Sequence, residues 1–346
     1  MKKSTAIVSA FLLAAFFAAC APATGLKTGA SAGEALIKML PKSATGVAAF
    51  DVRRLMGTDA VAKALQEPEA KAKYDGFVQM SGIDPLKDIS YVGIGLSAPP
   101  AGTALGSLEG GLIISLKYDK AKLQGLIREK APHVTEETYN GVTVYANLDA
   151  GITSRARLGR AAFLDETHIA LGTEAVLKGI IDVFQKRADS LAKNAEMAAI
   201  LRKADKSGIF WGAMAIPPEL LKKALDAAPQ AKILEGVKAL TLMYDDRVQG
   251  ILADIRTIGG TKDQNANLAA ALNGFKAMGA MFAAQEAAFG DFLNGLQITS
   301  GEDFTRLSLN VSHEVMDKLG QAAKAKAAEY MKTAKKDEAP APEVKK

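Results

Sequence analysis

The histidines and acidic residues of this sequence are the side chains that could carry out acid–base or metal chemistry. Its three histidines are His133, His168 and His313, and each has acidic residues nearby in the chain. No histidine lies at zinc-ligand spacing from another ligand residue. We therefore expect solvated surface histidines, no metal site and no catalytic residue at these positions.

Two neighbouring aspartates could form a carboxylate pair. Asp245 and Asp246 are typical of a hairpin turn, and Asp254 lies on the strand that follows. Acid–base catalysis by two carboxylates requires that their environments differ strongly. A turn explains Asp245 and Asp246 without any such role, so we interpret all three aspartates as structural.

Longer catalytic and cofactor motifs are absent from the sequence. It contains no G-x-S-x-G elbow, no H-E-x-x-H pair and no Walker loop. The glycine-rich segment 93–111 lacks the spacing of a dinucleotide-binding fingerprint. We interpret residues 97–110 as a long hairpin loop that is functional or disordered. The sequence thus predicts no enzyme activity and no cofactor.

Cys20 is the only cysteine, and it lies directly behind an apolar segment. Lys2 and Lys3 precede an uncharged stretch, residues 6–19, that is typical of a signal-peptide core. As a helix this stretch would span about 21 Å, which is short of the roughly 30 Å hydrocarbon core of a bilayer. We therefore predict a cleaved signal peptide over residues 1–19 rather than a membrane-spanning helix.

The sequence FAAC at residues 17–20 resembles the lipobox of bacterial lipoproteins, with phenylalanine in place of the usual leucine. The resemblance implies that Cys20 becomes the mature N-terminus and is the site of lipid attachment, with acyl chains such as palmitate. Chains of this kind anchor a protein stably in a membrane. Ala21 implies the outer membrane of the cell envelope, with the body on its periplasmic face. The alternative is an ordinary secretory signal cut after residues 21–23.

The charge of the mature chain is nearly balanced. Loss of Lys2 and Lys3 with the leader leaves 41 basic residues, from 43, against 38 acidic ones. The excess lies in residues 324–346, a lysine-rich charged tail. A neutral body argues against nucleic acid, whose binding depends on neutralising phosphates. Residues 20–33 are small and polar and predict a flexible tether.

Two segments of the body share a pattern. Residues 35–52 align without gaps with residues 199–216, with identity at four of 18 positions. In both segments a short helical stretch leads through a turn into a buried strand. We interpret residues 34–190 and 191–323 as two tandem pseudo-repeats.

The order of the elements predicts the fold class. Within each repeat, strands and helices follow the order β-α-β-β-α-β, as in ferredoxin-like folds. Asn140-Gly141 between two strand-like runs is typical of a tight hairpin. Leu307, Leu309 and Val311 alternate with polar residues, which indicates a strand with one dry face. We expect an α+β protein with antiparallel sheets and helices packed on one face.

The start of the body, LPKSATGVAAFDV at residues 40–52, resembles secreted bacterial proteins whose own function is unknown, so it implies no activity. Two similar halves on a lipid anchor favour a non-catalytic binding or scaffold module for an envelope protein or cell-wall partner. The alternative is a carrier that holds an apolar ligand within the α+β body. A periplasmic hydrolase is the third and least favoured function.

Acylation of Cys20 is directly testable. We expect the wild-type protein to incorporate labelled palmitate and to partition into a detergent phase, and Cys20→Ser to do neither, because the thiol is the lipid acceptor. Metabolic labelling followed by intact-mass measurement checks this. Ala21→Ser is the control that keeps the label. A wild-type protein that matures without acyl chains would overturn the anchor.

Overall fold

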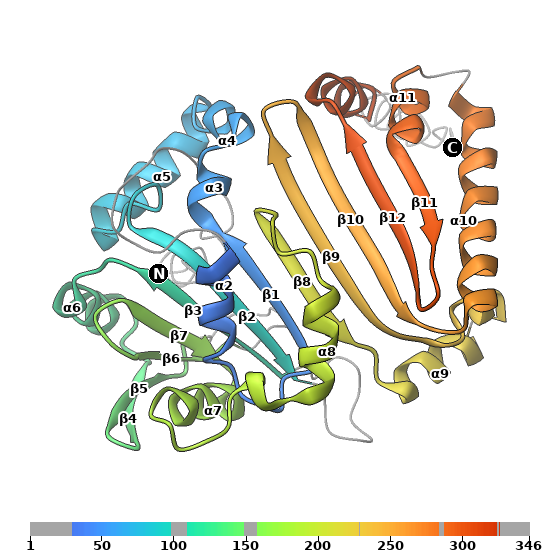
Figure 1. Ribbon diagram of the computed structural model, residues 1–346. Coiled ribbons are helices and arrows are strands. Elements are labelled where there is room, and N and C mark those ends of the chain that lie inside the picture. Colours follow the sequence, from blue (N-terminus) through green and yellow to red (C-terminus); the bar gives the residue numbers. More distant parts are fainter. Residues whose placement is uncertain are drawn as a thin grey trace, which may run out of the picture.

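The computed structural model describes residues 30–97, 109–148, 158–227, 229–283, 287–323 and 325. Within these ranges, twelve strands form a single antiparallel sheet, and helices lie along it (Figure 1). The protein is therefore a mixed α+β protein with an antiparallel sheet, as the sequence predicts. Cys20, the leader and most of the tail lie outside the described residues.

The strands divide into two sets along the chain. The first set is β1 (Gly46–Asp51), β2 (Ile89–Ser97), β3 (Glu109–Leu116), β4 (Thr135–Tyr139), β5 (Val142–Ala146), β6 (Arg160–Phe163) and β7 (His168–Gly172). The second set is β8 (Phe210–Ala215), β9 (Val237–Arg247), β10 (Gly250–Gly259), β11 (Leu296–Ser300) and β12 (Phe304–Val311).

Helices connect these strands. In the first half they are α2 (Ala30–Ile37), α3 (Val52–Met56), α4 (Asp59–Ala64), α5 (Pro68–Ser81), α6 (Lys120–Lys130) and α7 (Glu174–Phe184). The short 3-10 helix η1 (Leu191–Lys193) leads into the second half. There they are α8 (Ala195–Lys203), α9 (Pro218–Ala227), the 3-10 helix η2 (Pro229–Leu234), α10 (Lys262–Ala283) and α11 (Ala287–Gly295). Residues 313–323 are also helical.

β1 and β8 lie side by side at the centre of the sheet. From this pair the order is β1-β2-β3-β7-β6 on one side and β8-β9-β10-β12-β11 on the other, and the first half adds β5 and β4 at its edge. Ala48 and Gly212, which the sequence alignment equates, face each other in the central pair. The two halves thus repeat the same strand order in opposite directions from a shared centre.

The ferredoxin-like order is wrong. A split β-α-β unit would insert another strand between β1 and β2, whereas here these two strands pair directly and antiparallel. β2 in turn pairs with β3, so the first three strands form a meander. The order of elements along the chain did not determine which strands would pair.

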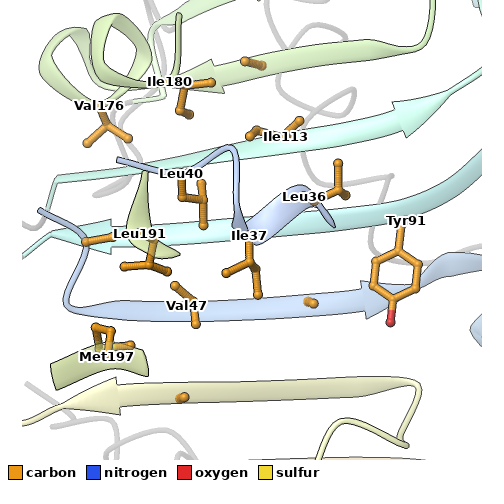
Figure 2. Packing of buried hydrophobic residues seen from close by; sticks show 14 of the residues in the cluster. Leu36, Ile37, Leu40, Val47, Tyr91, Ile113, Val176, Ile180, Leu191 and Met197 are labelled. Atoms are coloured by element: carbon orange, nitrogen blue, oxygen red, sulfur yellow. The ribbon is translucent and has the colours of Figure 1, made fainter. Parts of the chain in front are cut away.

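One face of the sheet, called here the α2 face, packs against α2, α7 and α8. Figure 2 shows Leu36 and Ile37 of α2 and Ile180 of α7 pointing toward the strand residues Val47 and Ile113. Trp211 from β8 belongs to the same cluster and is fully buried. This continuous core crosses the β1–β8 pair and joins the two halves.

Two glycines allow α2 to approach the strands closely. A Cβ atom at Gly93 would lie 2.9 Å from Cβ of Leu36, and one at Gly95 would lie 3.0 Å from a methyl group of Leu40. Both distances are shorter than normal carbon contacts. The glycine-rich segment beginning at residue 93 therefore serves helix packing in its first strand.

The opposite face, called here the α6 face, is covered in the first half by α3, α5 and α6. In the second half α10 covers its far end, where Thr305 Oγ1 donates to the backbone carbonyl of Asn265 at 3.1 Å. Between these helices the face is only partly covered, and Leu242 and Ile255 are 39% and 48% exposed. The prediction of helices on one face only is therefore wrong, because the strands are apolar on both sides.

Two smaller predictions also need correction. Residues 30–33, placed in the flexible tether, lie in α2, and Ala32 is buried. Asp245 and Asp246 lie within β9, and the turn follows at residues 248–249. The β4–β5 hairpin is confirmed, with Asn140 and Gly141 at φ of 49° and 79°.

Candidate ligand-binding cavity

The three histidines do not meet in space. His168, at the start of β7, lies 2.9 Å from Asp165, and His313 lies 2.7 Å from Asp246, so these two pair with different acids. His133 precedes β4. In the part of the chain that the structure describes, no three histidine, cysteine or acidic side chains come together as metal ligands.

The buried aspartates are held by arginines. Asp245 accepts from Arg54 at 2.6 Å and from Arg247 at 2.8 Å, while Asp254 accepts from Arg306. These contacts explain how carboxylates are tolerated at positions that are only 2% and 3% exposed. The acids therefore fix the strands and helix α3, which agrees with the structural interpretation although the predicted turn was misplaced.

A cavity of about 250 Å³ lies on the α6 face of the first half, between the sheet and the helices that cover it. Of the 21 described residues that line it, 20 are apolar and one, Lys130, is charged. They are Phe50, Val52, Leu55, Phe77, Met80, Ile83, Ile89, Val92, Leu112, Ile114, Leu116, Leu123, Leu126, Ile127, Lys130, Ala131, Leu148, Ala161, Phe163, Ile169 and Leu171.

The strand alternation supplies the floor of the cavity. Phe50 of β1, Val92 of β2 and Ile114 of β3 face one another across the sheet and point to the same side. Ile169 and Phe163 continue this row on β7 and β6. Because the row consists of branched and aromatic side chains only, the floor offers a ligand no hydrogen-bonding group.

Helix α6 forms one wall. It begins after Asp119, whose carboxylate accepts from the backbone N–H of Lys122 at 3.0 Å. Leu123, Leu126 and Ile127, at helical spacing, line the cavity. Gln124 Nε2 donates to the hydroxyl of the fully buried Tyr145 at 2.8 Å. This bond fixes the helix over the sheet without filling the cavity.

Helix α5 forms the opposite wall and is held mainly at its C-terminal end. It ends at Gly82 in the left-handed conformation, with φ of 74°. In the following loop, Asp84 accepts hydrogen bonds from Tyr74 of α5, from the backbone N–H of Leu86 at 2.9 Å and from Lys87 at 2.7 Å. Asp84 therefore ties the helix to the loop that leads into β2.

The charge states of Tyr74 and Asp84 follow from their surroundings. Burial raises the pKa of Tyr74, and its hydrogen bond to Asp84 raises it further. Burial opposes ionisation of Asp84, but the hydrogen bonds from Lys87, Tyr74 and Leu86 outweigh it and lower the pKa of this carboxyl. A tyrosine that donates and a carboxylate that accepts are both stabilised by the same contact.

The chemistry available in the cavity is binding rather than bond making. Apolar cavities of about 150 Å³ stay dry and bind small hydrocarbons, and this one is larger. Ligand sites in proteins are mostly apolar with a few polar groups that set orientation. Here Lys130 is the one charged lining residue among those described.

The sequence did not identify the cavity. The spacing of Leu123, Leu126 and Ile127 is the same as that of any helix that packs on a filled core. A void depends on how far the helix stands from the sheet, and neither periodicity nor composition reports that distance.

Cys20 and residues 98–108 of the predicted loop lie outside the described residues; Ser97 and Glu109 belong to the strands that flank it.

No family model and no curated protein sequence matches the chain. Three crystal forms of a solved protein, TP0453, are similar, all at 12% identity and over 81% of this chain. Form III has a TM-score of 0.45 over 96% of that chain, and forms I and IV have TM-scores of 0.43 and 0.42 over 94% and 95%. Likeness at this level carries no functional argument.

No helix among the described residues is long and apolar enough to span a membrane.

The hydrogen bonds of Asp84 predict that the stability of the protein depends on pH. Because its pKa is lowered in the folded state, the stability that Asp84 contributes is present above its unfolded pKa of about 3.9 and is lost as the pH falls through the folded value. We expect Asp84→Asn to lower the free energy of unfolding by about 1–2 kcal/mol at neutral pH and by less in acid. Urea unfolding at several pH values measures this.

Asp75→Asn is the matched control for Asp84→Asn. Asp75 also pairs with a lysine, Lys71 at 2.6 Å, but on the exposed side of α5. Its loss should change the unfolding free energy by less than about 0.5 kcal/mol. Equal effects of the two substitutions on the unfolding free energy would show that Asp84 does not specifically hold α5 to the loop that leads into β2.

Proposed function

We propose that this chain is a lipid-anchored protein of the cell envelope that binds an apolar ligand in the cavity between the α6 face and helices α3, α5 and α6. The observation that carries the proposal is the lining of the cavity, which is apolar at 20 of 21 described residues. This is the carrier of an apolar ligand that the sequence offers as the alternative to a binding or scaffold module. The anchor at Cys20 rests on the lipobox resemblance.

The energetics support a ligand site. Each methylene group transferred from water into such a site contributes about 0.8 kcal/mol. Transfer of a small hydrocarbon chain from water to this apolar lining would thus be favourable, which supports occupancy by an apolar molecule.

We propose a non-catalytic role. Among the described residues, the histidines pair with separate acids, and Asp245 and Asp254 are engaged by arginines. Apart from Lys130, the described residues that line the cavity carry no nucleophilic group and no carboxylate. A protein anchored through Cys20 would hold its ligand within reach of one membrane leaflet, which suits a receptor or a transfer partner.

We also propose that the two halves arose by internal duplication. The matching strand order on the two sides of the β1–β8 pair supports this, as does the position of Ala48 opposite Gly212. In this view the helices that cover the α6 face diverged. Those of the first half enclose a cavity, and those of the second half leave the equivalent strands open.

The open part of the α6 face favours a second candidate function, binding of an envelope protein. One row across the sheet runs through Leu112, Ile94, Ala48, Gly212, Leu242 and Ile255. Leu242 and Ile255 at its end are among the most exposed large apolar residues of the strands. Exposed apolar surface of this kind marks binding sites.

Narrowing the cavity tests the ligand site. We expect Leu112→Phe to place a ring in the cavity, to leave the unliganded protein as stable as the wild type or about 1 kcal/mol more stable, and to weaken binding of an apolar probe at least about tenfold. Fluorescence titration with phenylnaphthylamine and urea unfolding provide the two measurements.

Ile255→Phe is the matched control because Ile255 lies in the same row at the equivalent position of the other half. It adds the same ring outside the cavity and should not change probe binding. Unchanged binding in Leu112→Phe, with normal folding, would contradict the cavity as the ligand site.

The second candidate predicts contact at Ile255. A photoreactive benzoylphenylalanine at this position in intact envelopes should give one reproducible crosslinked protein, identified by mass spectrometry. The control position is Thr299, which is exposed on β11 on the other face of the sheet. Crosslinks to a second copy of this chain alone, or equal products at both positions, would contradict the proposal.

A further inference from the structure

The single charged residue of the cavity lining lies at the end of α6. Lys130 is the last residue of this helix, and its Nζ is 2.5 Å from the carboxylate of its neighbour Glu129. The two side chains are 47% and 67% exposed. Exposed pairs of this kind contribute little free energy, so Lys130 can exchange Glu129 for another anion at small cost.

Two further lysines of α6 lie close to the cavity. Lys120 Nζ is 6.0 Å from the centre of the ring of Phe163, which lines the cavity. Lys122 extends toward the C-terminal end of α5, where a Cβ atom at Gly82 would lie 2.6 Å from its Nζ. Neither lysine has an acidic partner within 4 Å among the side chains that the structure describes.

Lys120 and Lys122 thus place positive charge near the apolar interior, and Lys130 adds to it when it releases Glu129. An alkyl chain would occupy the cavity, and a negatively charged head group would remain at its mouth beside Lys130. The head group would keep part of its water there, so no charge would be buried. A zwitterionic or neutral head group would gain less from the same cations.

We propose that the ligand is a single-chain anionic amphiphile of the fatty-acid class, with its chain in the cavity and its carboxylate paired with Lys130. This inference rests on the proposed function, because it assigns the head group of a ligand in the same cavity. Lys120 and Lys122 add a longer-range attraction that salt would screen.

The test compares laurate with lauryl alcohol, which has the same alkyl chain and no charge. Binding of each to the full chain carrying Cys20→Ser is measured by displacement of phenylnaphthylamine at neutral pH. We expect laurate to bind about tenfold more tightly, which corresponds to about 1.4 kcal/mol. In Lys130→Gln this preference should fall to about threefold or less, while lauryl alcohol should bind as before.

Lys222→Gln is the control, since it removes one lysine from an exposed ion pair on α9, in the other half. It should leave the preference unchanged. Equal binding of the two probes to the wild type would overturn the head-group assignment and leave the apolar site standing. Binding of neither probe would overturn both. A preference that persists in Lys130→Gln would show that Lys130 is not the partner of the carboxylate.

Discussion

The structure depends on one constraint, which is that the central strands are apolar on both sides. Side chains alternate along a strand, so Val47 and Ala49 of β1 point to the α2 face while Ala48 and Phe50 point to the α6 face. Both faces of such a sheet must be covered by other elements. On the α2 face, helices α2 and α7 pack on the first half, and Gly93 in β2 brings helix α2 into direct contact with the strands.

On the α6 face the same requirement is met incompletely, and this is where the functional features lie. Helices α3, α5 and α6 cover the first half but leave the cavity. In the second half, Leu242 and Ile255 on the same face remain partly exposed. Phe50 lines the cavity and contacts Phe210 across the central pair, with ring centres 4.3 Å apart. The enclosed and the open apolar surfaces are therefore adjacent.

Local sequence patterns predicted local structure well. The Asn140-Gly141 turn and the α+β class follow from rules that act over a few residues. Strand pairing did not follow, because the same element order fits a meander and a ferredoxin-like sheet. The alternation of Leu307, Leu309 and Val311 also predicted a dry face, and on that face Val311 is buried while Leu307 and Leu309 are partly buried. The cavity is a property of the spacing between layers, which no residue pattern encodes.

The central β1–β8 pair has a consequence for how the protein unfolds. Its hydrogen bonds and the core of the α2 face, which includes Val47 from one half and Trp211 from the other, cross the midline of the molecule. If the two halves separated, β1 and β8 would each lose their partner strand, and both would become unpaired edges of a sheet. Denaturation should thus proceed as one cooperative transition, with no stage at which a single half survives intact.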